Sequence, residues 1–413
     1  MRIFTGEFRK IWNRPLLYVT LAVTMVLNVI FLLFTDYRSV TNPRFEEIVY
    51  GTKEFRQQFA GPITEQWIQE REAEEAAILA DPANRVGPEE EQEILKVLRE
   101  NRGLSRYTDK ELLEMDVFFL NKQASDCYNQ YEDIGFAINL RKRVSETGEE
   151  LARGYRERYP GEKGERFAQK AQTMYHAYLN GYEPYYGWHM GFDCLQDILK
   201  VFPYLVGVSI LIALVPVFSE EYARKTDGLI LTAKHGRKKV AAGKLGAGFL
   251  SAGLIWGIFV CVDAVLAFAV YGPEGARAFW PGGGFQALPY PWNQGQALAV
   301  GLATSLLGAV CVSGFVMLIS SLCRSRFACV VIGAVLLLIP MIGYPEIPLL
   351  TPVFPYTATS LLRGTYLWET FHLVPVFGQP VQYQTVVVLS QVILFAVSIS
   401  VTVRAFCRHQ VKA

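Results

Sequence analysis

The residues best suited to chemistry lie in a charged stretch between two long apolar runs, from Phe218 to Leu245. Its end, GRKKVAAGKL, is the closest approach to a nucleotide-binding P-loop in the chain. A P-loop needs four residues between its glycines and a Ser or Thr after the lysine to bind Mg²⁺. Here six residues separate Gly236 from Gly243, and Leu245 follows Lys244. We therefore predict that this stretch does not bind nucleotide phosphates.

No other pattern matches a catalytic or metal-binding motif. The sequence contains no HExxH, GxSxG or CxxC, and its histidines are scattered, at His176, His189, His235, His372 and His409. Catalytic and metal-binding groups need such side chains at fixed spacings. We predict that the chain is not an enzyme and holds no cofactor or metal of its own.

One carboxylate, Asp263, falls inside an apolar run, FVCVDAVLAF. A charge inside a membrane is costly, so such a residue indicates a functional position by default. The alternative is a buried, hydrogen-bonded or water-facing group without such a role. Asn28, in the first apolar run, is interpreted in the same structural way, as a polar contact between helices.

Aromatic side chains are dense between Tyr182 and Phe192, just before another apolar run. Tyr185, Tyr186 and Trp188 belong to this group. Such rings favour the headgroup region of a membrane, which predicts an interfacial belt. Aromatic rings also line pockets for amphipathic molecules, so Tyr185, Tyr186, Trp188 and Phe192 are also candidates for a ligand-contacting mouth.

The composition indicates an all-α integral membrane protein. Of 413 residues, 51% are hydrophobic and 13% aromatic, which is too apolar for an ordinary soluble chain of this length. A helix needs about 20 apolar residues to cross a bilayer. Such runs predict six transmembrane helices, at residues 15–35, 199–218, 245–271, 295–322, 327–344 and 385–404. A cleaved signal peptide is the alternative for the first run, but that run is too long and no cleavage site follows it.

Basic residues fix the predicted orientation. Residues 219–244 are rich in Lys and Arg, and residues 1–14 form a basic, amphipathic segment typical of an interfacial helix. Short loops rich in Lys and Arg stay on the cytoplasmic side. We predict that residues 1–14, 219–244 and the tail 405–413 are cytoplasmic in a bacterial-type plasma membrane.

Residues 36–198 are predicted to form a large extracellular domain. Acidic residues outnumber basic ones there, and no run could span a bilayer. Strong helix formers from Glu65 to Ala80 and several cap signals predict helices rather than strands. Two capping boxes are predicted, Thr108 with Glu111 and Thr147 with Glu150.

Two further segments are predicted on the outer side. Residues 272–294 are rich in Gly and Pro and carry little charge, which predicts a loop. Residues 345–384 are apolar but broken by prolines, which favours short re-entrant or surface helices. Cys127 and Cys194 also lie on this side, where a disulfide between them could form.

The charged segment 219–244 has an internal order that suggests a partner. Glu220 and Glu221 are predicted near a helix N-terminus, where acids oppose the positive end of the helix dipole. The apolar insert Leu229 to Leu231 needs a surface to pack against, which favours a protein partner. The alternative is that the basic residues only anchor the segment to anionic lipid.

With six spans and this inner segment, the chain resembles the permeases of the type-2 ABC exporter family. The resemblance is carried by Glu220, Glu221, Arg224, Lys225, Gly228, Leu229, Ile230, Leu231, Thr232, Arg237 and Lys244. In that family this loop forms a coupling helix that sits in a groove of a separate ATPase subunit. Many relatives have a proline shortly after the LILT-like turn, whereas this chain has Ala233 to Gly236.

The resemblance implies a permease that exports an amphipathic cargo, such as a peptide antibiotic, drug or lipid. ATP and Mg²⁺ would be bound by cytosolic ATPase subunits, and a second copy or a related permease would complete the path. The bilayer is then the other partner, no nucleic acid is expected, and Asp263 with the aromatic group becomes a candidate for cargo contact. The alternative function is a sensor or scaffold that presents the extracellular domain without transport.

Overall fold

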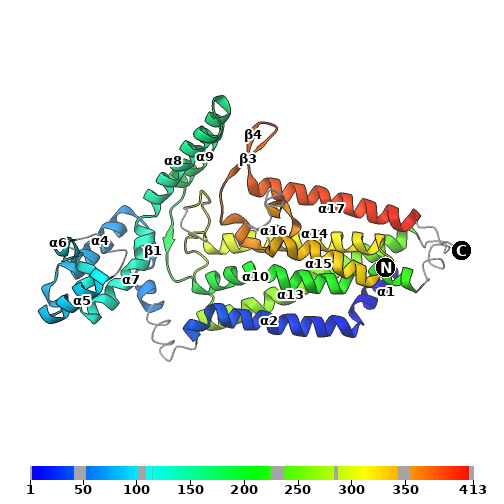
Figure 1. Ribbon diagram of the computed structural model, residues 1–413, viewed down its shortest axis with the longest axis horizontal. Helices are drawn as coiled ribbons and strands as arrows, with labels where there is room; N and C mark the ends of the chain where they lie inside the picture. The colour runs from blue at the N-terminus through cyan, green and yellow to red at the C-terminus, as the bar shows by residue number, and fades with distance from the viewer. Residues whose placement is uncertain are drawn as a thin grey trace.

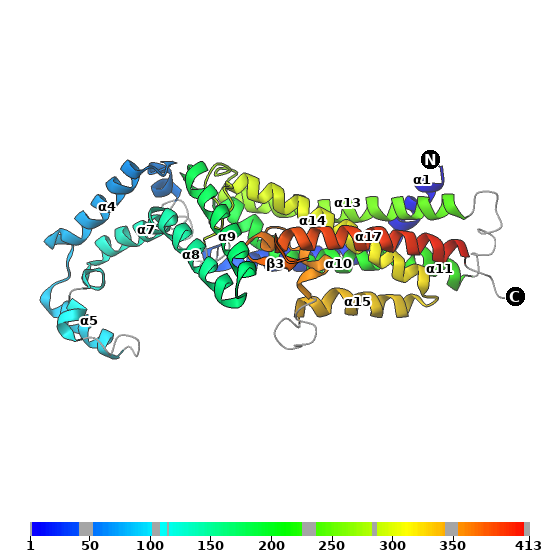
Figure 2. The ribbon, with the colours of Figure 1, turned by 90° about the horizontal axis from the view of Figure 1, so that it is seen from above.

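The computed structural model describes residues 2–40, 53–100, 108–113, 115–224, 237–282, 287–342 and 354–408. The chain forms a bundle of long helices with a body of shorter helices at one end (Figures 1 and 2). The amphipathic helix α1 (Arg2–Trp12) and the last turns of α17 (Tyr383–Arg408) lie at the other end of the bundle.

Apolar helices make up the bundle: α2 (Pro15–Val40), α10 (Met190–Leu214), α11 (Pro216–Ala223), α13 (Lys238–Tyr271), α14 (Gln294–Leu322), α15 (Arg326–Ile342) and α17. Within the described residues, four candidate spans are long and apolar enough to cross a membrane: Tyr204–Ala223, α13, α14 and α17. Helices α1 and α2 count as a fifth if the pair, bent by 58°, is one span. The apolar stretch of α15 is shorter, Arg326–Leu338. The helices fit a multi-pass membrane protein.

Large apolar side chains point outward from the bundle. Leu16 on α2 is 62% exposed, Val265 on α13 is 68% exposed and Ile393 on α17 is 63% exposed. Soluble proteins rarely leave apolar patches of this kind uncovered. Their exposure agrees with a bundle surrounded by hydrocarbon.

The junction between α10 and α11 is stabilised by a serine from another helix. Pro216 occupies the first turn of α11, where its missing N–H costs no hydrogen bond. The Ser320 hydroxyl of α14 donates to the Val215 carbonyl (2.5 Å) and accepts from the N–H groups of Phe218 (3.0 Å) and Ser219 (3.1 Å). The backbone groups at the break therefore have partners, and α11 is positioned on α14.

Short helical turns between α15 and α17 pack into the bundle. They are η3 (Phe354–Tyr356), α16 (Ala358–Leu362) and η4 (Gly364–Trp368). Gly308 of α14 permits their close approach, because a Cβ there would lie 2.8 Å from the Leu361 carbonyl carbon. Ser305 donates to the Leu362 carbonyl at 2.8 Å. These turns agree with the short helices predicted for this segment.

A β-hairpin follows, which the sequence analysis did not predict. Strands β3 (Leu373–Val376) and β4 (Gln379–Gln382) pair antiparallel around Phe377 and Gly378. Both turn residues have positive φ, the conformation that two-residue hairpin turns require. The prediction of helices alone for 345–384 is therefore wrong in its last part, because prolines that break helices are tolerated on edge strands, and both strands of a two-stranded sheet are edges.

The body at the end of the bundle is helical. It contains α4 (Glu65–Ala80), η1 (Pro82–Asn84), α5 (Pro88–Glu100), α6 (Asp109–Leu113), η2 (Asp116–Phe119), α7 (Lys122–Ile138), α8 (Leu140–Arg158) and α9 (Glu162–Gly181). Two short antiparallel strands, β1 (Gly61–Pro62) and β2 (Tyr185–Tyr186), lie on the side of this body that faces the bundle (Figure 1).

One of the two predicted capping boxes forms. The Thr108 N–H donates to the Glu111 carboxylate at 2.7 Å, and the Glu111 N–H donates to the Thr108 hydroxyl at 3.4 Å. The box at Thr147 is wrong, because α8 begins at Leu140 and runs through it. Neighbouring helix formers outweigh the local cap pattern there. Cys127 is exposed and Cys194 is buried, and no disulfide joins these two residues.

The two connecting segments predicted on one side pack against this body. The Tyr175 hydroxyl donates to the Ala287 carbonyl (3.0 Å), and the Tyr182 hydroxyl donates to the Trp292 carbonyl (3.1 Å). From the hairpin, the Leu373 N–H donates to the Tyr155 hydroxyl at 2.6 Å. Body and connections therefore share one hydrophobic core.

Candidate functional site

A buried ion triad joins three helices at the end of the bundle opposite the helical body. Lys244, 1% exposed, places its ammonium 2.7 Å from Glu7 of α1 and 2.7 Å from Glu221 of α11. The same nitrogen donates to the Val217 carbonyl at 2.9 Å. Lys10 adds a 2.7 Å contact to Glu7 from its more exposed position. Such pairing compensates the large cost of burying charge.

A second cluster surrounds Glu220 on the same short helix. Its carboxylate contacts Arg14 at 2.7 Å, Arg224 at 2.7 Å and Arg326 at 3.0 Å. Arg14 precedes α2 and Arg326 begins α15, so this acid connects the ends of further helices. The two clusters line a cavity of about 460 Å³.

The charges of the triad lower the pKa of Glu7. Burial alone would raise the pKa of this carboxyl, but the Lys244 and Lys10 ammonium groups hold the pKa below its ordinary value of 4.5. Glu7 is therefore charged at neutral pH, and its charge contributes to holding α1 on α13.

Several of the predicted coupling residues lie in helices and not in the loop between them. Glu220 and Glu221 lie in the second half of α11, which begins at Pro216. The prediction that they lie near a helix N-terminus is therefore wrong, because α11 starts one turn earlier. Lys244 lies in the first two turns of α13, so the segment connecting the helices is shorter than the predicted 219–244.

Of the remaining predicted coupling residues, some are exposed and the others lie outside the described residues. Arg224 is the C-cap residue of α11, with 68% of its side chain exposed, and Arg237 is the N-cap residue of α13. Lys225, Gly228, Leu229, Leu231 and Thr232 lie outside the described residues. Lys238 and Lys239 are exposed at the start of α13. Exposed cations therefore flank the segment on both sides, while Glu221 and Lys244 face the interior.

Asp263 and Asn28 form a buried pair between α2 and α13. Asp263 is 0% exposed and Asn28 is 2% exposed, and the amide donates to the carboxylate at 2.5 Å. One helical turn away, Thr24 and Ser209 hydrogen-bond at 3.0 Å between α2 and α10. The arrangement matches the structural interpretation of Asn28, a polar contact between helices.

The aromatic group fills the junction between the helical body and the bundle. Trp188 donates to the Tyr271 carbonyl at 2.8 Å, and Phe192 packs on Phe268 with ring centroids 5.2 Å apart. Tyr186 is 3% exposed, whereas Tyr185 is 37% exposed. Three of the four predicted mouth residues are thus packing residues in this structure.

Sequence reasoning missed Glu7, Arg14 and Arg326 as members of the charged clusters. A signal for Glu7 existed, because it is the single acid in a basic helix. Its partner Lys244 follows 237 positions later, so nothing local connects them. Within the described part of the chain, no group of His, Cys, Asp or Glu side chains could hold a metal ion.

Comparisons with known proteins do not assign the chain to a class. No protein-family model matches the sequence, and no curated protein matches it. Its function is therefore inferred from the charged clusters, the apolar helices and the arrangement of their ends.

Proposed function

We propose that this chain is the permease subunit of an ATP-driven ABC exporter, powered by a separate ATPase subunit. The observation that carries the proposal is the triad in which Lys244 joins α1, α11 and α13 beside the basic segment. A displacement of that segment would move all three helices, because the triad connects them directly. Such a junction is suited to transmitting the motion of a partner.

The proposal counts six spans: α2, α10 with α11, α13, α14, α15 and α17. The 17 residues of α15 extend about 25 Å, slightly less than the hydrocarbon thickness of about 30 Å. Local thinning of the bilayer accommodates such a mismatch at modest cost. The basic end of the bundle is then cytoplasmic, and the helical body at the other end is extracellular.

The exposed cations are the proposed contact with the ATPase, and the buried triad is the transmitting element. Arg224, Lys238 and Lys239 present positive charge that would complement an acidic groove. Glu221 and Lys244 are buried and act within the permease. A second permease copy or a related chain completes the path, and the cargo is amphipathic.

The test is a charge reversal, Arg224→Glu with Lys239→Glu, in the chain reconstituted with an ATP-binding-cassette ATPase that co-purifies with it. We expect cargo-stimulated ATP hydrolysis to fall at least about tenfold, because like charges would then oppose each other at the interface. The matched control, Lys142→Glu with Lys170→Glu, makes the same charge change on exposed residues of the helical body. Unchanged coupling in the first variant would refute the assigned contact, whereas a wild-type chain that gives no cargo-stimulated ATP hydrolysis would favour a sensor or scaffold.

A further inference from the structure

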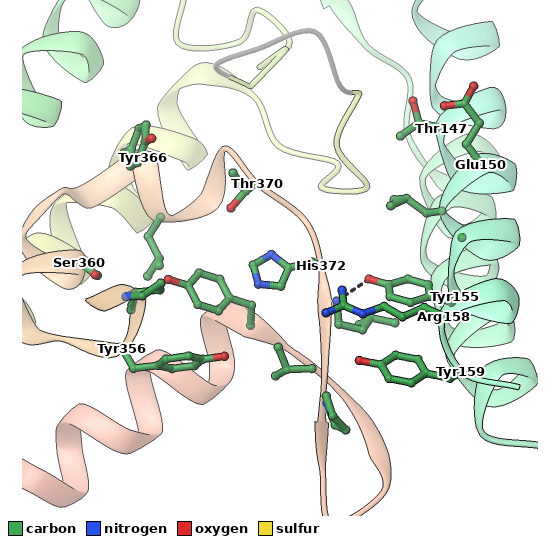
Figure 3. Close-up of a pocket in the computed structure, with 18 of the residues that line it drawn as sticks. Thr147, Glu150, Tyr155, Arg158, Tyr159, Tyr356, Ser360, Tyr366, Thr370 and His372 are labelled. Atoms are coloured by element: carbon green, nitrogen blue, oxygen red, sulfur yellow. Dashed lines mark hydrogen bonds between the residues drawn. The ribbon is translucent and has the colours of Figure 1, made fainter. Parts of the chain in front are cut away.

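A large cavity lies where helix α8 faces the hairpin and the short turns before α17. Its volume is about 1060 Å³, just above the roughly 300–1,000 Å³ typical of ligand pockets. In Figure 3, Thr147, Glu150, Tyr155 and Arg158 of α8 and its C-cap residue Tyr159 lie on one side. Tyr356, Ser360 and Tyr366 lie on the other side, and Thr370 and His372 lie between. The cavity is at the end of the bundle away from the charged clusters.

Five tyrosines line the cavity, and hydrogen bonds hold two of them in place. The Tyr155 hydroxyl accepts from the Leu373 N–H, and the Tyr383 hydroxyl donates to the Pro355 carbonyl at 2.8 Å. His372 stacks on Tyr383 with centroids 4.3 Å apart. Fixed rings present flat apolar faces at little entropic cost, which suits an amphipathic ligand.

The cavity is also positively charged. Arg158 and Arg363 line it from different walls, against the single carboxylate of Glu150. Burial and the neighbouring Arg158 both lower the pKa of His372, so its imidazole is neutral at pH 7. The cavity therefore carries excess positive charge at neutral pH.

Arg363 is prepared to bind an anion. Its guanidinium lies 3.6 Å from the centroid of the Tyr366 ring, which fixes its plane. Its Nε is buried and has no hydrogen-bond acceptor among the described residues. A buried donor without an acceptor is costly, and a shift of the side chain that brings Nε to a ligand oxygen would remove that cost.

We propose that this cavity binds an amphipathic molecule with an acidic group, either a phosphate or a carboxylate. Arg363 binds the acid, Arg158 adds positive charge from the opposite wall, and the tyrosine rings hold the apolar part. That the bound molecule is the exported cargo rests on the proposed function. Binding itself requires no ATPase.

The test is native mass spectrometry of the full chain in a neutral maltoside detergent. The probes are lysophosphatidic acid, dodecanoate and, as a zwitterionic match, lysophosphatidylcholine. We expect the acidic probes to bind at least about tenfold more tightly than the zwitterion, and Arg363→Gln to weaken them about tenfold. Binding of lysophosphatidic acid alone identifies a lipid phosphate, and binding of dodecanoate alone identifies a carboxylate.

The control is Arg153→Gln, an exposed arginine of α8 outside the cavity, which should bind like the wild type. Should Arg363→Gln fail to fold, the exposed Arg158→Gln provides the same comparison. Equal binding of the zwitterion, or full binding by a folded Arg363→Gln or Arg158→Gln variant, would overturn the proposal. Because no ATPase is present, failure here is distinguishable from failure of ATPase coupling.

Discussion

Replacement of Lys244 by methionine should weaken the attachment of α1 to the bundle strongly. The lysine is 1% exposed and holds two carboxylates at 2.7 Å, so its removal leaves Glu7 and Glu221 facing each other. Breaking a buried pair costs about 3–5 kcal/mol. Lys10 remains 2.7 Å from Glu7 and 3.7 Å from Glu221, so we expect the lower end, about 3 kcal/mol.

Hydrogen exchange of the α1 amides, together with thermal unfolding in detergent, measures this loss. Lys10→Met is the matched control, because its side chain is 57% exposed and exposed pairs contribute at most about 1 kcal/mol. The neutral combination Glu7→Gln, Lys244→Met and Glu221→Gln should recover most of the protection, since no buried charge is left unpaired and Lys10, which loses both acids, is 57% exposed. Equal effects of Lys244→Met and Lys10→Met would refute the reasoning.

Three further outcomes are expected. The pKa of Glu7 is lowered on folding, so its stabilisation is complete above its ordinary value of 4.5 and lost as the pH falls through the folded pKa; hydrogen exchange of α1 against pH measures this. Gly148→Leu should destabilise the α8–α9 pair by about 1–3 kcal/mol in thermal unfolding, because a Cβ at position 148 would lie 2.8 Å from Tyr175. Gly154→Ala should stabilise α8 by about 1 kcal/mol in the same assay, because a Cβ at position 154 would meet no atom within 4 Å. Asp263→Asn should keep the melting temperature, whereas Asp263→Leu should lower it by leaving a buried amide without an acceptor, a cost of about 1–3 kcal/mol.

Features set by neighbouring residues could be predicted from the sequence. Helix α4 begins at Glu65 and ends before Asp81-Pro82 as predicted, because helix formers and a proline decide those bounds. The long apolar runs predicted α13, α14 and α17, since length and hydropathy are local properties. The amphipathic helix α1 was recognisable from the spacing of its apolar residues.

Features that depend on distant partners could not be predicted. The role of Lys244 depends on Glu7, which is far away in the sequence. From the sequence, Lys244 was therefore interpreted as one more basic residue of the charged segment. Glu220 and Glu221 were assigned to the wrong end of a helix because Pro216, inside the apolar run, starts α11. The hairpin at 373–382 depends on packing of Leu373 against the helical body, which no local pattern records.

Affinity purification of the chain from its own cells, with a search for a bound ATP-binding-cassette ATPase, tests the central claim most directly. The account predicts a complex that hydrolyses ATP, weakens as salt screens the exposed cations, and is lost in the Arg224→Glu with Lys239→Glu variant. Purification of the wild-type chain without any ATPase at low salt would contradict the account and favour a sensor or scaffold.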